Sequence, residues 1–397
     1  MLNKGTQQQP WGFTLRIRMN TYSVIMLGPS GSGKTVFLAS LYKKLSTQGD
    51  TGFFLQVESA EKRKRLNNLY TQIAVDEKWP KGTTYSEVSE WTFTCRVQTE
   101  GLPIYSACQF TYLDYAGGRI NDEMGEEDPE FDNQLKNADA LLGLLDGQRL
   151  LALMQGEAFG RVWAVNDLPN MLNIMQEIQN KPIHFVISKW DIIEGRYTLE
   201  EIIDRLYKID EFRNLIRTRS RGNIPIRLIP ISAVGKDFAT LKKDGSMSKN
   251  SQTLPKPFQV EVPLACVLPD MIQTKLKEIM QQRKEIYDTP IDVQANVSFW
   301  DWLGELVGEA VSIVSHLLPK KYQFAADILE RLIEFLDTPI EQKREVANNR
   351  MLQLQREKEE ALKKVTDEET ALNYIINCFL NIQNRLDYNF PESNLKQ

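Results

Sequence analysis

The feature that most constrains this chain is the run GPSGSGKT at residues 28–35, which matches the phosphate-loop pattern GxxxxGK[ST]. The apolar run 22–27 precedes the loop and the apolar-rich segment 36–42 follows it, so a strand leads into the loop and a helix leaves it. Further apolar runs of strand length alternate with helical segments along the chain. The sequence therefore predicts an α/β fold with a mostly parallel central sheet flanked by helices.

The residue types in this loop suit a phosphate group. Glycines let the backbone turn so that successive N–H groups converge on phosphate oxygens at the start of a helix, where the helix dipole adds attraction. We expect the lysine to reach the β- and γ-phosphates and to act in catalysis, and the threonine hydroxyl to bind Mg²⁺. The predicted phosphate-binding residues are Gly28, Ser30, Gly31, Ser32, Gly33, Lys34 and Thr35.

Composition narrows the class of protein. The chain has 397 residues, enough for two or three domains, and a net charge of −5, which argues against a broad nucleic-acid surface. Its four cysteines are scattered without a CxxC pair, and two histidines cannot supply a histidine-rich metal site. The first ten residues lack the apolar segment of a signal peptide, and no stretch is long and apolar enough to span a membrane. These features predict a soluble cytoplasmic protein.

A second motif follows the apolar segment 106–113, which ends in Asp114. Ligands bind outside the carboxyl ends of strands in open α/β sheets, so we expect Asp114 to provide a Mg²⁺ contact. Gly117 is placed so that its N–H can meet the γ-phosphate. Upstream, either Thr83 or Thr84 lies just before the strand 91–97, where a threonine can sense the γ-phosphate through Mg²⁺.

A third motif, SKWD at residues 188–191, ends the strand 183–187 and bears on the base. An aspartate accepts hydrogen bonds from the N1 and N2 donors of guanine, whereas adenine offers an acceptor at N1 and nothing at C2. We therefore expect Asp191 to select guanine and Lys189 to lay its aliphatic stem over the base. Ser188 is shorter than the Asn or Thr of the pattern [NT]KxD. After the strand 224–231, Ser232 and Ala233 form a turn in which the Ala233 N–H would donate to guanine O6.

Together, GPSGSGKT, DYAGG, SKWD and ISAVG occur in order, each at a strand end, and residues 12–290 resemble the translation-factor-class (Ras-like) P-loop GTPase domain. The helical insertion before residues 79–84 and the double glycine Gly117-Gly118 are similar to bacterial double-GTPase proteins of conflict or defence-like systems. The resemblance implies GTP or GDP binding, Mg²⁺ and a switch that depends on the γ-phosphate. Gly118 replaces the glutamine that often orients the attacking water, so we expect slow hydrolysis unless Arg119 or a partner substitutes.

The domain prediction is a GTPase domain over residues 1–290 and a helical region over 291–397. A polar loop is expected at 236–258, followed by a closing helix from about residue 269. In the tail, an apolar stripe at helical spacing follows residue 365, and acidic residues in the segment 298–318 argue against a membrane span. We expect a protein partner or effector to bind through residues 291–397, and self-association is possible.

Three functions remain open at this point. The first is a GTP-dependent switch whose loops reposition the tail. The second is a P-loop ATPase in which the SKWD motif is coincidental. The third is a GTP-bound scaffold that hydrolyses little.

Overall fold

The structure is a computed structural model in which residues 19–81, 89–101, 103–114, 129–178, 180–222, 224–286 and 343–395 are described. The segment 298–318 and the boundary at residue 290 lie outside these residues. The division into two domains therefore stays a prediction. No helix among the described residues is both long and apolar enough to cross a membrane.

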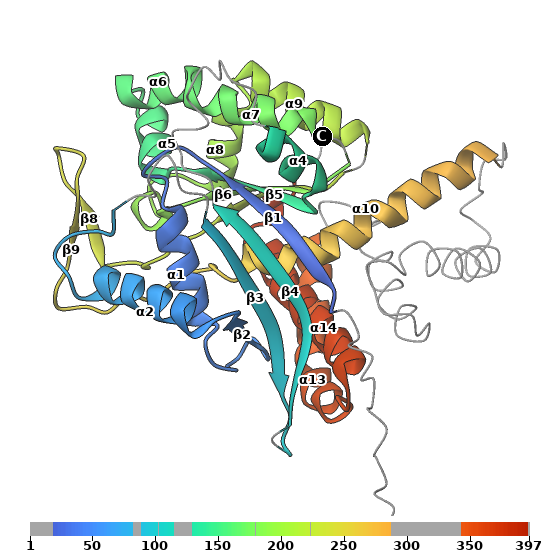
Figure 1. The fold of residues 1–397 in the computed structure, drawn as a ribbon. Coiled ribbons are helices and arrows are strands. Elements are labelled where there is room, and N and C mark those ends of the chain that lie inside the picture. The colour runs from blue at the N-terminus through green and yellow to red at the C-terminus, as the bar shows by residue number, and fades with distance from the viewer. Residues whose placement is uncertain are drawn as a thin grey trace, which may run out of the picture.

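A seven-stranded sheet forms the centre of the molecule, in the order β2-β3-β4-β1-β5-β6-β7 (Figure 1). Strands β4, β1, β5, β6 and β7 pair in parallel, whereas β3 is antiparallel to both of its neighbours. The predicted mostly parallel sheet is confirmed. The strands are β1 (Thr21–Leu27), β2 (Phe54–Val57), β3 (Ser89–Gln98), β4 (Ile104–Asp114), β5 (Ala140–Leu145), β6 (Ile183–Ile187) and β7 (Ile226–Pro230).

Alternate residues of the central strand face two separate cores. In β1, Val24 and Met26 join one apolar cluster, and Ile25 and Leu27 join the other. All four side chains are fully buried, because a parallel sheet is covered by helices on both faces. This explains why β1 reads as a continuous apolar run rather than as an alternating one.

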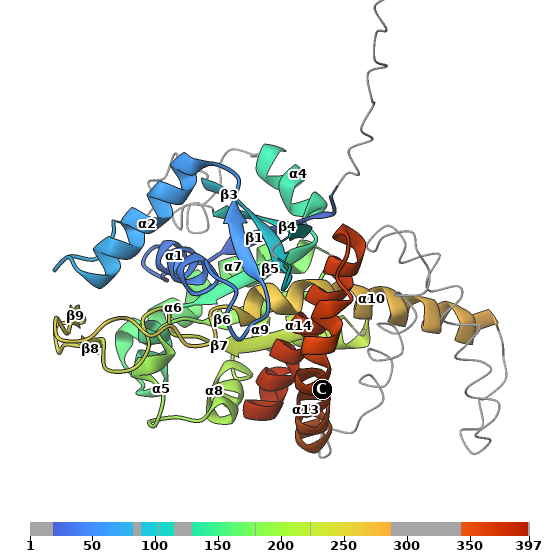
Figure 2. The same cartoon turned by 90° about the horizontal axis from the view of Figure 1, so that it is seen from below.

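Helices cover both faces of the sheet (Figures 1 and 2). The first cluster includes residues of α1 (Lys34–Lys44), α2 (Ala60–Ala74), α10 (Val262–Ile286), α13 (Lys343–Lys363) and α14 (Glu368–Asn389). The second includes residues of α4 (Pro129–Asn137), α5 (Gly147–Met154), α6 (Ala158–Val165), α7 (Asp167–Glu177), α8 (Leu199–Leu206) and α9 (Asp210–Arg221). Two short 3₁₀ helices, η1 (Trp190–Ile192) and η3 (Pro391–Ser393), complete the described helices.

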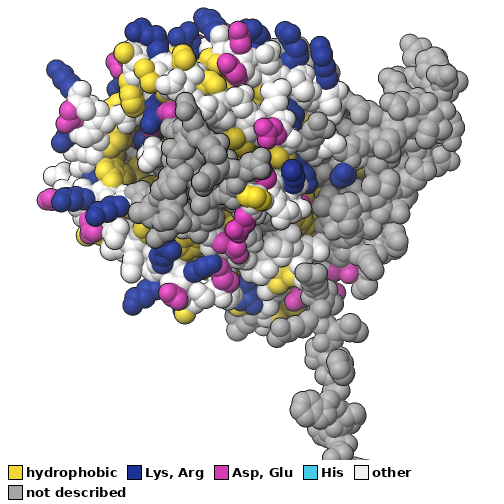
Figure 3. Space-filling view, turned by 45° about the horizontal axis from the view of Figure 1, so that its top comes forward, with side chains coloured by type: hydrophobic (Ala, Val, Ile, Leu, Met, Phe, Trp, Pro, Cys, Tyr) yellow, Lys and Arg dark blue, Asp and Glu magenta, His cyan; other side chains and the backbone are white. Residues whose placement is uncertain are grey.

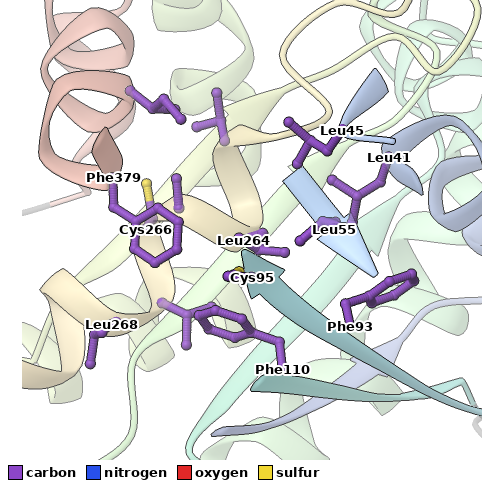
Figure 4. Close-up of a cluster of buried hydrophobic side chains, with 14 of the residues drawn as sticks. Leu41, Leu45, Leu55, Phe93, Cys95, Phe110, Leu264, Cys266, Leu268 and Phe379 are labelled. Atoms are coloured by element: carbon purple, nitrogen blue, oxygen red, sulfur yellow. The ribbon is translucent and has the colours of Figure 1, made fainter. Parts of the chain in front are cut away.

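The apolar stripe of the C-terminal tail is part of the core that lies against the sheet. Measured between centroids, the Phe379 ring of α14 lies 5.9 Å from that of Phe110 in β4 (Figure 4). It lies 5.3 Å from the ring of Phe53. The stripe residues are all buried: Leu372, Ile375, Phe379, Ile382 and Leu386. This stripe is therefore covered by the chain's own sheet and is not a surface open to a partner.

A buried polar network fixes α10 and α14 on the sheet. Arg227 of β7 donates through Nε and Nη2 to both carboxylate oxygens of Asp270 in α10, at 2.7 and 2.9 Å, and through Nη1 to Asp387 of α14 at 3.1 Å. His184 and Gln383 also bond to the Asp270 carboxylate. The Arg227 guanidinium holds the pKa of Asp270 well below its usual range. Because an unpaired buried charge is costly, the network holds the end of the chain to β7.

Two local expectations differ from the structure. Part of the loop predicted at 236–258 folds into a hairpin of β8 (Ala239–Leu241) and β9 (Met247–Lys249). The closing helix α10 begins at Val262 instead of near residue 269, with Pro269 inside it. Proline removes one backbone donor from a helix, but residues Leu264–Leu268 are completely buried in the core. That burial offsets the lost hydrogen bond.

Candidate functional site

Four loops at the carboxyl ends of β1, β5, β6 and β7 surround one cavity of about 490 Å³. This volume is in the range of sites that hold a small ligand. Residues 30–37, in and after the phosphate loop, line the cavity. The loop after β6, here called the base loop, contributes Ser188, Lys189 and Asp191, and the turn after β7 contributes Ala233. The structure thus brings together three of the motifs that the sequence predicted to act as one site.

The phosphate loop has the backbone that a phosphate cradle requires. Gly31 and Gly33 have φ values of 81° and 94°, in the left-handed region that favours glycine. Gly33 caps α1, which begins at Lys34, so the first N–H groups of that helix have no acceptor within it. The loop is closed by a 3.2 Å hydrogen bond from Ser32 N to Pro29 O. These N–H groups form a preformed site for an anion at the helix N-terminus.

Lys34 is nearly buried in the wall of the cavity, with 7% of its surface exposed. Its Nζ donates to the Gly28 carbonyl at 2.7 Å, and more weakly to the Pro29 carbonyl at 3.5 Å. Burial lowers the pKa of the lysine, and the nearby Asp114 carboxylate partly opposes that shift. A desolvated ammonium of this kind gains more from a phosphate than an exposed one would.

Asp114 ends β4 beside the start of the phosphate loop. It pairs in register with Met26 of β1 and is 2% exposed. Together with the Thr35 hydroxyl it offers two oxygen ligands, the donor type that Mg²⁺ prefers. Mg²⁺ is usually held by one or two protein ligands together with substrate phosphates, so this pair fits that ion. Among the described residues, no group of three or more acidic, histidine or cysteine side chains forms a metal site by itself.

The base loop is tied to the phosphate loop by Lys189. Its Nζ donates to the Gly31 carbonyl at 3.1 Å and to Asp146 Oδ1 at 2.7 Å. The shorter Ser188 bonds instead to the Leu145 carbonyl at the end of β5, at 3.3 Å. The link between these two loops is therefore made by Lys189 and not by Ser188.

Asp191 is oriented by the turn after β7. The Ser232 hydroxyl accepts a hydrogen bond from Gly235 N at 2.7 Å and donates to Asp191 Oδ1. Asp191 Oδ2 is buried and makes no hydrogen bond with the described residues, although Asp191 lines the cavity. Burial raises the pKa of this carboxyl, and the Ser232 hydroxyl partly lowers it again. A desolvated acceptor without a partner is expected to bind a donor on the ligand.

Gly147 lets the loop after β5 approach the base loop. A Cβ at this position would lie 2.1 Å from the Ser188 carbonyl oxygen, so any side chain must displace the backbone. We expect Gly147→Ala to weaken GTP binding on the order of tenfold, because Lys189 and Asp191 follow directly on the displaced residue. Titration of fluorescent GTP measures this. Gly49→Ala is the control, since nothing lies within 4 Å of a Cβ there; equal affinities for both variants would contradict the assignment.

Several cavity residues were missed by the motif analysis. Asp146 follows β5 at the same sheet edge as Asp114, so the strand-end rule alone would have found it. Gln148 and Arg149 follow it, and Arg149 forms an ion pair with Asp167. Other lining residues come from two distant segments and carry no local motif: Trp79, Pro80 and Lys81 after α2, and Gly245 and Met247 of the hairpin.

Some predicted site residues lie outside the described ones. These are the switch candidates Thr83 and Thr84 and the residues Gly117, Gly118 and Arg119 after β4. Their roles stay predictions.

Helix α6 presents an apolar surface beside the cavity. Phe159 lines the cavity and is 51% exposed, and Val162 and Val165 on the same helix are 58% and 73% exposed. Apolar side chains are visible on the upper left of the face in Figure 3, the region in which α6 lies in Figure 1. The cavity therefore opens next to an exposed apolar helix.

Comparison with protein-family models gives no match, and comparison with curated proteins gives none either. Among solved structures, the chain is similar to the small GTPase Arl6 (BBS3) of Trypanosoma brucei, at 16% identity and a TM-score of 0.28, over 54% of this chain and 88% of that one. It is also similar to the SRb-GTP/SRX signal recognition particle receptor complex of Chaetomium thermophilum, at 14% identity and a TM-score of 0.34, over 54% and 92%. It is also similar to the S. cerevisiae Ski7 GTPase-like domain bound to GTP, at 17% identity and a TM-score of 0.33, over 57% of this chain and 46% of that one. At these TM-scores the alignments carry no argument, so the conclusions rest on the sheet and the site.

Proposed function

We propose that this chain binds GTP with Mg²⁺ and hydrolyses it slowly or with a partner's help, acting as a nucleotide-dependent switch. One observation carries the proposal: Lys34 and the unpartnered Oδ2 of Asp191 belong to the walls of the same cavity. A cation at a helix N-terminus suits the phosphates, and a carboxylate acceptor suits the N1 and N2 donors of guanine. Adenine offers no such pair of donors, so the site supports GTP over ATP.

The proposal assigns tasks to several groups in and beside the cavity. The helix N-terminus and Lys34 hold the phosphates, and Asp191, oriented by Ser232, reads the base. Lys189 keeps the two loops in one arrangement through Gly31. Thr35 and Asp114 would hold Mg²⁺, which neutralises phosphate charge when bound. Ala233, at the cavity wall, would donate its N–H to guanine O6.

The finer parts of the proposal rest on the sequence. We infer a cytoplasmic location, supported by four free and buried cysteines, and a role in a bacterial defence-like system, supported by the resemblance to double-GTPase proteins. An effector would bind through residues outside the buried stripe of α14, within the region 291–397. Gly118 supports slow intrinsic hydrolysis.

A paired assay tests the function. Equilibrium binding and turnover are measured with GTP and with ATP, with Mg²⁺ or with EDTA, over a series of protein concentrations. Selective GTP binding with Mg²⁺-dependent turnover that rises with protein concentration is expected for a switch that self-association activates. Preference for ATP would overturn the guanine assignment. Tight GTP binding without turnover at any concentration would favour the scaffold.

Guanine binding should be lost on acidification at a higher pH than an exposed aspartate would give. Asp191 accepts hydrogen bonds from guanine only when ionised, and burial raises the pKa of its carboxyl above the usual 3.8. Binding is therefore complete well above this raised pKa and falls as the pH drops through it, at a higher pH than for an exposed aspartate. The measurement is the ratio of GDP to ADP affinity against pH, in which phosphate protonation cancels. A ratio that stays constant down to pH ~4 would contradict the prediction.

A further inference from the structure

The β8–β9 hairpin forms part of the cavity wall, together with the phosphate loop and the loop after β6. It follows the turn containing Ser232 and Ala233, and both Gly245 and Met247 line the cavity. In Figures 1 and 2 it runs along the side of the molecule between α2 and α5. Because these two helices belong to opposite core clusters, the hairpin connects the two sides of the site.

Lys249 of β9 attaches the hairpin to the end of α2. Its Nζ lies 4.6 Å from the centroid of the Trp79 ring. The Trp79 indole N–H donates in turn to the Met247 carbonyl of the hairpin at 2.8 Å. A cation is favourable at a helix C-terminus and over an indole ring. The carbonyl acceptors of Lys249 Nζ are those of Gln72 at 2.6 Å, Asp76 at 2.8 Å and Lys78 at 3.0 Å.

A second attachment lies at the hairpin tip. Gln148, at the start of α5, donates through Nε2 to the Gly245 carbonyl at 2.7 Å. The tip itself is stiffened by Asp244 Oδ1, which accepts from the Ser246 N–H at 2.9 Å and from its hydroxyl at 2.6 Å. The hairpin is thus fixed at both sides of the cavity, by Lys249 and Trp79 on one side and by Gln148 on the other.

We propose that the β8–β9 hairpin is a latch over the nucleotide site, so that nucleotide enters and leaves only when the hairpin detaches from α2 and α5. This inference rests on the proposed nucleotide binding. The attachments join protein atoms to protein atoms, so they oppose entry as much as exit. A latch of this kind slows exchange without changing affinity, which favours a protein that holds one nucleotide for a long time.

Lys249 is the position at which the latch can be tested, because it does not line the cavity. In Lys249→Ala we expect both the association and the dissociation rate of fluorescent (methylanthraniloyl) GDP to rise about tenfold, with an unchanged dissociation constant. Lys249→Arg should retain slow exchange, since it keeps the charge and several donors. Asp244→Ala should accelerate both rates to a smaller extent by loosening the tip. Lys243→Ala, an exposed change on the same hairpin, should leave them unaltered.

The rates are measured by stopped-flow mixing and by displacement with unlabelled GDP, and thermal melts show whether each variant is folded. Parallel acceleration in Lys249→Ala and Asp244→Ala supports the latch. A rise in the dissociation rate alone would mean that the hairpin only contributes contacts, and unchanged rates in folded variants would mean that it does not gate exchange; both overturn the proposal. Failure of the unaltered chain to bind GDP would instead refute the proposed function.

Discussion

Asp191→Asn is expected to convert a site selective for guanine into one that prefers xanthine nucleotides. The Ser232 hydroxyl donates to Oδ1, so an asparagine would keep its carbonyl oxygen there and place its amide nitrogen where Oδ2 now lies. That nitrogen is a donor and would face the N1 and N2 donors of guanine. GTP affinity should fall about 10³-fold, through the loss of two charge-assisted hydrogen bonds. Xanthine carries a carbonyl at C2, which accepts from the amide.

Competition of GTP, XTP and ATP against a fluorescent nucleotide measures this change. Glu194→Gln is the matched control, because it makes the same acid-to-amide change at an exposed position three residues away. Its nucleotide preference should equal that of the unaltered chain. If Asp191→Asn retained full GTP affinity, the assignment of the base site would be wrong, whatever happened to XTP.

The parts of the site that the sequence predicted are those carried by local motifs. Lys34 and Asp191 stand at fixed distances from the ends of apolar strands, and parallel strands bring those ends to one edge of a sheet. The structure places both in the wall of one cavity. Local spacing was sufficient here because each loop is short and each strand is buried.

Contacts between segments distant in sequence could not be predicted in this way. Trp79 and Met247 are 168 residues apart and meet only because the hairpin folds back over α2. The polar composition of residues 236–258 indicates a loop, and nothing local specifies where it docks. The hydrogen bond from Lys189 to the Gly31 carbonyl could not be predicted from the sequence either, because the motif pattern predicts only that this lysine lies over the base.

The C-terminal tail shows what periodicity alone does not predict. The spacing of Leu372, Ile375 and Phe379 correctly indicated an apolar helical face, but periodicity does not say which surface covers it. The structure places that face on β3, β4 and α10, and Arg227 joins it to β7 through Asp387. Because β7 leads into Ser232, the hydrogen bond between Arg227 and Asp387 links the C-terminal helix to the strand that precedes the residue bonded to Asp191.

Lys34→Ala is expected to weaken GTP, GDP and ATP binding alike by at least ~100-fold, because phosphate is common to all three nucleotides. The loss has two sources. The ammonium is nearly buried, so its attraction for phosphate is poorly screened, and its removal also leaves the Gly28 carbonyl without the donor it now has. Arginine at this position should not restore binding, since its larger planar head does not fit the space that Nζ occupies between the Gly28 and Pro29 carbonyls.

Isothermal titration with all three nucleotides measures the effect, with Lys64→Ala, an exposed change in α2, as the control for loss of charge. The pattern across the two site variants is diagnostic. Asp191→Asn should change the order of nucleotide preference, whereas Lys34→Ala should lower every affinity and keep the order, because in the proposed arrangement one residue reads the base and the other holds the phosphates. Tight binding retained in a folded Lys34→Ala variant would overturn the phosphate-loop assignment and, with it, the orientation of the nucleotide between Lys34 and Asp191.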